Sequence, residues 1–424
     1  MRALLAGLLL LCPLPARAES LVIRNARIVT LTEQGILEGA EILIRDGRIA
    51  RVGDVGQAPA EATEIDAAGG SVTPGLFNSY THLGLVEISL VPETVDWRTR
   101  DRLFSAAFRV APALNPRSTL VAQNRLHGLT HAVVAPESGH HVFSGQGAVV
   151  RLGGAEGFTL DASAAVFAGY GSAAGRLAGG SRAAAYARLR QALADAREFA
   201  ANRAAAMRGE WRELSLPLHD LEVLVPVIGG RKLLVVTSHR ASDIRALLEL
   251  KREFDLRLAI AGATEGWLVA AELAAAGVPA IVDPMANVPE SFERLGARLD
   301  NAARLHAAGV KLLFRSTDEL GTHAAWLVRQ GAGNAAAHGL PPLEAIRAMT
   351  RNPAEVFGLA DRFGTIAPGR AADLVVWDGD PLELMTRARA VIIDGEAIPL
   401  VSRATRLRDR YLELGSPTPF GLRK

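Results

Sequence analysis

The sequence predicts an α/β fold: a (β/α)8 TIM barrel with a small β-sandwich domain built from the N- and C-terminal segments. Two patterns in the 424 residues support this prediction. Short apolar stretches alternate with alanine-rich helical stretches through a middle region of about 290 residues, which suits a closed eight-stranded barrel with insertions. Short strands of alternating polarity occur at both chain ends. We expect the small domain at residues 19–72 plus 365–402, the barrel at 73–364 and a tail at 403–424.

The first 18 residues have the features of a secretory signal peptide. Arg2 precedes an apolar run, and Ala16-Arg17-Ala18 offers a small-residue cleavage site. We therefore expect cleavage after Ala18 and a protein that is periplasmic or secreted. The run is too short to cross a bilayer, so no membrane span is predicted. The single cysteine, Cys12, lies inside this segment, which leaves the mature chain without a thiol for a disulfide, a metal or catalysis.

The charge balance argues against a nucleic-acid partner. Removal of Arg2 and Arg17 with the signal peptide reduces the 47 basic residues to 45, which equals the 45 acidic residues. A neutral, mixed surface lacks the basic stripe that nucleic-acid binding usually needs. We expect a small-molecule substrate or ligand as the partner, and the sequence makes no prediction of the oligomeric state.

The small domain is predicted from strands at the two ends of the chain. Residues 22–29, 40–45 and 49–52 alternate in polarity, and Asp46-Gly47 between the last two is a strong hairpin signal. Similar strands return at residues 372–377 and 391–395, so two distant segments should share one sheet.

The barrel is predicted from apolar strands that alternate with helical stretches such as 242–254 and 265–275. Repeated strand–helix units indicate a parallel sheet, with the active site at the C-terminal ends of its strands. Residues 181–211 add a long amphipathic helix. The strand candidates are residues 130–135, 233–236, 258–260, 280–282 and 310–314.

Residues 72–84, which read VTPGLFNSYTHLG, carry the most specific motif. They resemble the first barrel strand of the amidohydrolase superfamily, in particular its imidazolonepropionase-like periplasmic members, where a Pro-Gly-Leu/Phe-x-x-x-His-x-His run ends in two metal-binding histidines. Residues two apart on a strand point the same way, so such a pair can reach one metal ion. Tyr80 stands at the first of these positions and His82 at the second. The resemblance thus implies a degenerate metal site.

Two further segments are similar to the same superfamily. Residues 369–381, GRAADLVVWDGDP, with the IDG of residues 393–395, resemble its returning small sheet. Residues 352–359, NPAEVFGL, resemble the helix before that sheet. The resemblance covers nearly the whole mature chain, and it implies the barrel fold.

The resemblance also implies metal ligands on later strands. Thr237 stands where a fifth-strand histidine is expected, with His239 next on the same face as a displaced ligand. Gly262 replaces a sixth-strand histidine. On the eighth strand, Asp318 matches the acid that binds metal and takes a proton from the attacking water. Because a catalytic zinc generally has three protein ligands, the candidate metal site is His82, His239 and Asp318, holding one divalent ion, zinc first, or none if the site is degenerate.

A glycine-rich loop follows the second barrel strand at the same mouth. Residues 135–147 read APESGHHVFSGQG, and such loops usually line substrate pockets. Adjacent residues normally point apart, so at most one of its two histidines should reach the pocket. The predicted pocket residues are Tyr80, Glu137, His140, His141, Gln146, Thr237, Arg240 and His323.

Two functions follow from these residues. The first is an exported, metal-dependent hydrolase of non-peptide C–N bonds, such as those of cyclic amides, with metal-activated water and Asp318 as catalytic general base. The alternative is a non-catalytic barrel that has lost its metal and binds a ligand or a protein partner. Substrate identity does not follow from the sequence, because barrel loops set specificity and vary freely.

Overall fold

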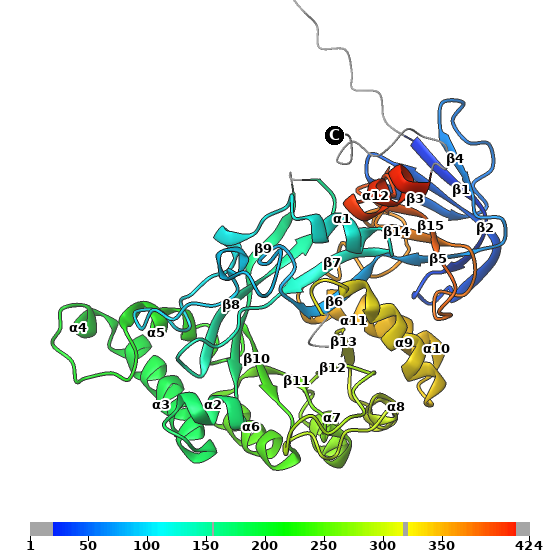
Figure 1. Cartoon of the computed structure of the whole chain (residues 1–424). Coiled ribbons are helices and arrows are strands. Elements are labelled where there is room, and N and C mark those ends of the chain that lie inside the picture. The colour runs from blue at the N-terminus through cyan, green and yellow to red at the C-terminus, as the bar shows by residue number, and fades with distance from the viewer. Residues whose placement is uncertain (1–19, 155–156, 317–320, 413–424) are drawn as a thin grey trace, which may run out of the picture.

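A computed structural model of the protein describes residues 20–154, 157–316 and 321–412. The predicted signal peptide and Asp318 lie outside these residues. Two eight-stranded sheets organise the described chain, one made from both chain ends and one that curls into a barrel (Figure 1). The predicted α/β class, with a barrel and a small β domain, is confirmed, while the predicted residue boundaries of the domains stay predictions.

The small sheet joins the two ends of the chain as expected. Pairing of β14 with β5 brings the C-terminal strands beside the N-terminal ones. The hairpin turn at Asp46 and Gly47 has positive φ angles of 50° and 72°, which is the geometry that an Asp-Gly turn favours. Its strands are β1 (Ser20–Val29), β2 (Ile36–Arg45), β3 (Arg48–Gly53), β4 (Thr63–Asp66), β5 (Ser71–Pro74), β14 (Leu374–Trp377), β15 (Ala388–Ile393) and β16 (Glu396–Ala397).

The second sheet runs in chain order from β6 to β13, and these two strands contact each other, so the barrel nearly closes. Each predicted barrel strand coincides with a strand of this sheet. The strands are β6 (Leu76–Thr81), β7 (Leu129–Val134), β8 (Phe143–Arg151), β9 (Thr159–Gly169), β10 (Leu233–Ser238), β11 (Arg257–Gly262), β12 (Ala280–Val282) and β13 (Leu312–Phe314).

Helices surround the barrel from α2 through α11, as Figure 1 shows. The long amphipathic helix predicted over 181–211 is divided into α3 and α4 at Asn202. None of the helices in the described part of the chain has the length and hydropathy to span a bilayer. The helices are α1 (Thr119–Arg125), α2 (Ser172–Leu177), α3 (Arg182–Ala201), α4 (Arg203–Met207), α5 (Leu218–Leu224), α6 (Ala241–Phe254), α7 (Ala270–Ala275), α8 (Asn301–Ala307), α9 (Val328–Ala337), α10 (Pro342–Ala348), α11 (Arg351–Val356) and α12 (Arg403–Leu412).

One barrel strand departs from the expected all-parallel pattern. Strand β8 pairs antiparallel with both β7 and β9. Parallel neighbours need a crossover of a dozen or more residues, but only residues 135–142 separate β7 from β8. The chain therefore turns back at the mouth, and the glycine-rich loop is the turn.

The barrel interior is filled by alternate residues of its strands. Phe77, Val133, Phe167, Val235 and Leu313 belong to one buried apolar cluster. Side chains on a strand alternate between its two faces, so residues two positions further along β10 and β13 also point inward, toward the C-terminal end of the barrel. That end is the mouth.

A buried polar cluster joins the barrel to the small sheet. Asp373, next to β14, lies 3.1 Å from Nε2 of His131 on β7 and accepts a 2.8 Å hydrogen bond from Nε of Arg151 on β8. Arg151 Nη1 also lies 3.0 Å from Asp394. The His131 ring stacks on Phe77 with centroids 4.2 Å apart. These contacts give His131 a scaffold role.

Candidate functional site

A cavity of about 620 Å³ opens at the barrel mouth, where β6, β9 and β10 end. Loops that follow β7, β12 and β13 complete its wall. It brings together most of the residues predicted for the site from different strands. The predicted residues that line it are Tyr80, His82, Glu137, Thr237, His239 and His323.

His82 is held by acceptors on both ring nitrogens. Its Nδ1 lies 2.8 Å from the carbonyl oxygen of Ala135, and its Nε2 lies 3.2 Å from Oε1 of Glu137. Burial alone would raise the pKa of Glu137, but its hydrogen bond to His82 and the charge of that ring lower the pKa below its ordinary value. Each ring nitrogen thus lies within hydrogen-bonding distance of an oxygen acceptor. Trp97 covers this ring at a centroid distance of 4.7 Å.

His239 lies deeper and is electrically neutral. Its Nδ1 is 2.8 Å from Oγ1 of Thr264, and its Nε2 is 3.3 Å from Nη2 of Arg294. Burial, with a further contribution from Arg294, lowers the pKa of His239 to about 4. A Cβ built on Gly262 would lie 2.5 Å from Cε1 of His239. The imidazole therefore occupies the space that a sixth-strand side chain would need.

Arg315 places a guanidinium in the interior of the mouth. It follows β13, two residues after Leu313, which faces the barrel interior. Its Cζ lies 4.6 Å from the centroid of the Tyr80 ring. Burial raises the pKa of Tyr80, while the charge of Arg315 and a hydrogen bond with Thr237 act in the opposite direction. Tyr80 is thus part of a half-buried cation–aromatic contact.

The described residues do not fit a catalytic metal ion. Within the described ranges, no group of three or more histidine, aspartate or glutamate side chains is placed to hold one. His82 and Glu137 are close, but Nε2 of His239 faces the guanidinium of Arg294. A half-buried cation beside a would-be ligand opposes a second cation. Asp318, the remaining predicted ligand and general base, lies outside the described residues.

Four predicted pocket residues do not line the cavity. Gln146 faces away, because Val149 on the same strand faces the interior and side chains alternate. Its Oε1 accepts hydrogen bonds of 2.7 Å from both Lys232 and Ser163. Arg240 lies beside the inward His239 and at the start of α6, so it points elsewhere. These placements correct the prediction.

His140 and His141 are the other two residues outside the cavity. A 2.7 Å hydrogen bond between Ser138 and Ser144 closes the base of their loop at the cavity wall, and neither histidine is among the residues that line the cavity. Burial and the nearby charges of Arg188 and His140 lower the pKa of His141 to about 4. Among the described residues, neither histidine belongs to a group of three or more side chains that could hold a metal ion.

Several lining residues were not predicted from the sequence: Trp97, Glu293, Arg294 and Arg315. Arg315 could have been found, because it follows the interior Leu313 by two residues and strand side chains alternate. The others lie on irregular loops, where no periodic pattern marks the direction of a side chain. Glu293 accepts hydrogen bonds from the backbone of Ser172 at 2.8 Å and from Arg182 at 2.9 Å, and these lower its pKa although burial raises it.

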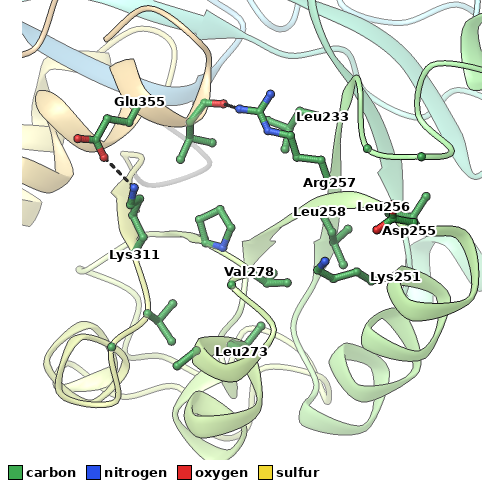
Figure 2. Close-up of a pocket in the computed structure, with 18 residues that line it drawn as sticks. Leu233, Lys251, Asp255, Leu256, Arg257, Leu258, Leu273, Val278, Lys311 and Glu355 are labelled. Atoms are coloured by element: carbon green, nitrogen blue, oxygen red, sulfur yellow. Dashed lines mark hydrogen bonds and ion pairs between the residues drawn. The ribbon is translucent and has the colours of Figure 1, made fainter.

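A larger cavity of about 730 Å³ lies at the opposite end of the barrel (Figure 2). Lys311 Nζ lies 2.7 Å from Glu355, and Arg257 donates to the carbonyl oxygen of Val356 at 2.5 Å. Both cations thus attach the end of α11 to the barrel. Because this end carries the N-termini of the strands, where barrels place stabilising rather than catalytic residues, we assign the cavity to the scaffold.

Comparisons with known proteins agree with the barrel and its additional sheet. The model of the amidohydrolase family matches residues 247–399. Adenine deaminase 3 of Rhizobium meliloti (strain 1021) is 31% identical over 85% of this chain and 55% of its own length. Adenine deaminase of Deinococcus deserti is 30% identical over 84% of this chain and 56% of its own length. The chain thus spans about half the length of these curated relatives.

Among solved structures, an amidohydrolase from Thermotoga maritima MSB8 superposes with a TM-score of 0.80. The alignment covers 90% of this chain and all of the other, at 24% sequence identity. At that identity the likeness concerns the fold alone.

Proposed function

This chain belongs to the amidohydrolase superfamily, and from that premise we propose that its barrel mouth is a small-molecule binding pocket that works without a metal ion. Members generally use a divalent metal, and the adenine deaminase relatives suggest a hydrolase that acts on C–N bonds. The proposal therefore assigns this chain the pocket of the superfamily without the metal chemistry.

The contact between Arg315 and Tyr80 carries this proposal. A fixed positive charge lies against the side chain that replaces the first metal-binding histidine. Two nearby positions reinforce it. Thr237 replaces the fifth-strand ligand, and the ring of His239 fills the space beside Gly262. Like charges in a partly desolvated cavity repel, so a guanidinium beside Tyr80 disfavours a dication at this position.

Metal-dependent hydrolysis of a C–N bond is the second candidate function, and the orientation of His82 favours it. A metal-binding histidine usually donates one ring N–H to a carbonyl or carboxylate and turns the other nitrogen to the ion. His82 shows the first half of this arrangement, with Nδ1 on the Ala135 carbonyl, and Nε2, now 3.2 Å from Glu137, is the nitrogen that would bind an ion. This candidate requires Asp318 as a third ligand and as the general base.

Metal analysis separates the two candidates. The protein would be purified without chelators, analysed by mass spectrometry for metals, and assayed with cyclic amides, acyl-amino acids and adenine, with and without chelator. We expect less than about a tenth of a metal ion per chain, even after incubation with zinc or manganese, and no chelator-sensitive hydrolysis. About one ion per chain that is lost in both His82→Ala and Asp318→Ala would overturn the proposal in favour of the second candidate.

Export is a separate proposal that rests on residues 1–18 alone. Their charged, apolar and small-residue segments follow the order of a signal peptide. N-terminal sequencing of the protein from its native host would test it. A mature chain that begins at Glu19 is expected, whereas a chain that retains Arg2 would contradict export by this route.

A further inference from the structure

We propose that Ser163 and Lys232 form a second reactive site, on the outer side of the barrel, where Ser163 accepts the acyl group of a small activated ester. Lys232 is the general base, and Gln146 positions its amine. None of the three residues lines the mouth cavity, so the site does not depend on the function of the mouth. The geometry of the three side chains carries the inference.

The three side chains come from neighbouring strands and meet in one hydrogen-bonded triangle. Gln146 lies on β8, Ser163 lies on β9, and Lys232 immediately precedes β10 (Figure 1). Lys232 Nζ donates to Oε1 of Gln146 at 2.7 Å and also to Oγ of Ser163. The Ser163 hydroxyl lies 2.7 Å from the same Oε1. A hydroxyl within reach of an amine, with a third group that orients the amine, is the arrangement of a nucleophile and its base.

A β-bulge presents Ser163 to solvent. Two consecutive pairs of the β8–β9 ladder, Gly147 with Ala165 and Val149 with Asp161, enclose one residue of β8 but three of β9. Ser163 is the middle one of the three. Bulges redirect side chains and are frequent beside active sites. The carboxylate of Asp161 accepts the backbone N–H of Ser163 at 2.8 Å, and the serine is half-buried, so a small ester can reach it.

The SGQG motif of residues 144–147 holds Gln146 in place. The backbone N–H of Gln146 donates to the Phe108 carbonyl oxygen at 2.7 Å, and its own carbonyl oxygen accepts from Val110 at 3.2 Å. A Cβ at Gly145 would lie 2.5 Å from that Phe108 oxygen, so glycine permits this close approach. Gln146 is itself buried. It is therefore a positioning residue, whose side-chain oxygen keeps Lys232 beside the serine.

The surroundings of Lys232 favour the neutral amine that a general base needs. Burial lowers the pKa of Lys232 below its ordinary value. Of the two charges that act on the amine, Asp161 raises this pKa and Arg109 lowers it. The two acceptors of Lys232, on Gln146 and Ser163, are uncharged oxygens, so neither stabilises the ammonium as a carboxylate would.

The reaction transfers one acyl group and one proton. Oγ of Ser163 forms a bond to the carbonyl carbon of the ester, while the hydroxyl proton passes to the neutral amine of Lys232. The bond between that carbon and the leaving oxygen breaks, and the oxygen keeps the electron pair. It then takes the proton from Lys232, so the products are an acyl-serine and an alcohol. Aryl esters suit this site because a phenolate departs readily.

Acetylation of the full chain by p-nitrophenyl acetate tests the inference. The protein is incubated with the ester between about pH 7 and pH 10, and mass spectrometry of its peptides locates the acetyl group. We expect Ser163 to be acetylated at least about tenfold faster than any other residue. Acetylation of Lys232 in place of Ser163, or no preference for Ser163, would overturn the inference.

Variants assign the roles of the two residues. Ser163→Ala should remove the fast acetylation, and Lys232→Met should slow it about a hundredfold. Lys311→Met is the matched control, because Lys311 pairs with Glu355 at 2.7 Å and should not affect Ser163. If Lys232→Met does not fold, Lys232→Arg keeps the charge but stays protonated, and it should be similarly slow. A wild-type rate in a folded Lys232 variant would refute the assignment.

The pH dependence separates a base from a merely structural lysine. Acetylation of wild-type Ser163 should accelerate with pH and level off below about pH 10.4, the ordinary pKa of lysine. Gln146→Glu places a carboxylate beside the amine, which raises the pKa of Lys232 and should move this acceleration to higher pH. The same pH profile in wild type and in Gln146→Glu would contradict Lys232 as the base.

Discussion

The imidazole of His239 fills the space that a side chain at position 262 would need. A Cβ at that position would lie 2.5 Å from Cε1 of His239 and 2.8 Å from its Nδ1. Gly262 also has a φ of 91°, which side chains rarely adopt. The absence of a side chain at position 262 is therefore coupled to the inward position of His239. A histidine cannot simply be restored at 262 while His239 stays in place.

Gly262→Ala should destabilise the protein by about 2–4 kcal/mol, through the positive φ and through the overlap with His239. Urea denaturation of the wild type and the variant measures this loss. The same change in a His239→Ala background should cost about 1 kcal/mol, since only the backbone term remains. Equal costs in the two backgrounds would show that the ring does not occupy the space at 262.

Asp373 stabilises the junction between the barrel and the small sheet through its contacts with His131 and Arg151. Asp373→Asn leaves Arg151 buried with a weaker partner, and we expect a loss of about 3–5 kcal/mol in the free energy of unfolding. Asp394 is the matched control because it binds the same guanidinium, at 3.0 Å, while its side chain is 69% exposed. Asp394→Asn should cost at most about 1 kcal/mol. Similar losses of unfolding free energy in both variants would show that the buried position of Asp373 is not what makes its contact with Arg151 stabilising.

Acid should weaken this junction in a defined pH range. Burial alone would raise the pKa of Asp373, but His131 and Arg151 lower it to about 2. The pKa of this carboxyl in the unfolded chain is about 3.9. Its contribution of about 2–3 kcal/mol to the free energy of unfolding is therefore complete above that pH and is lost as the pH falls toward 2.

Burial lowers the pKa of His131 in the folded protein. Below about pH 6.5 the histidine therefore takes up a proton more readily in the unfolded chain than in the folded one, and the free energy of unfolding falls further. Urea midpoints measured from pH 7 to pH 3 should decline, and Asp373→Asn should decline less below pH 4. A parallel decline in wild type and variant would contradict this assignment.

The sequence predicted the fold because apolar strands and specific motifs repeat along it, yet it placed only part of the site. Thr237 lies on β10, where alternation from the interior Val235 gives the direction of its side chain. Tyr80 and His82 follow an irregularity in the pairing of β6, so the motif and not alternation placed them. His140, His141 and Arg294 lie on loops whose direction depends on contacts distant in sequence. The reversed β8 was missed, although the short link of residues 135–142 already rules out a parallel crossover.

The loop over the mouth, residues 283–300, should depend on Glu293 for its order. Glu293 joins this loop to α2 through the backbone of Ser172 and to α3 through Arg182. Glu293→Gln removes the charge from both hydrogen bonds, and charge-assisted bonds of this kind contribute about 1.5–3 kcal/mol. Amide hydrogen exchange around Glu293 should therefore accelerate by roughly tenfold to a hundredfold, while exchange in the barrel strands stays unchanged.

Glu290→Gln is the control for this prediction. Glu290 lies in the same loop and pairs with Arg294, but its side chain is 54% exposed, so its loss should change exchange little. Amide hydrogen exchange, measured by mass spectrometry on both variants, shows which of the two carboxylates keeps the loop ordered. If Glu290→Gln accelerates the loop as much as Glu293→Gln does, the contacts with Ser172 and Arg182 do not hold it over the mouth.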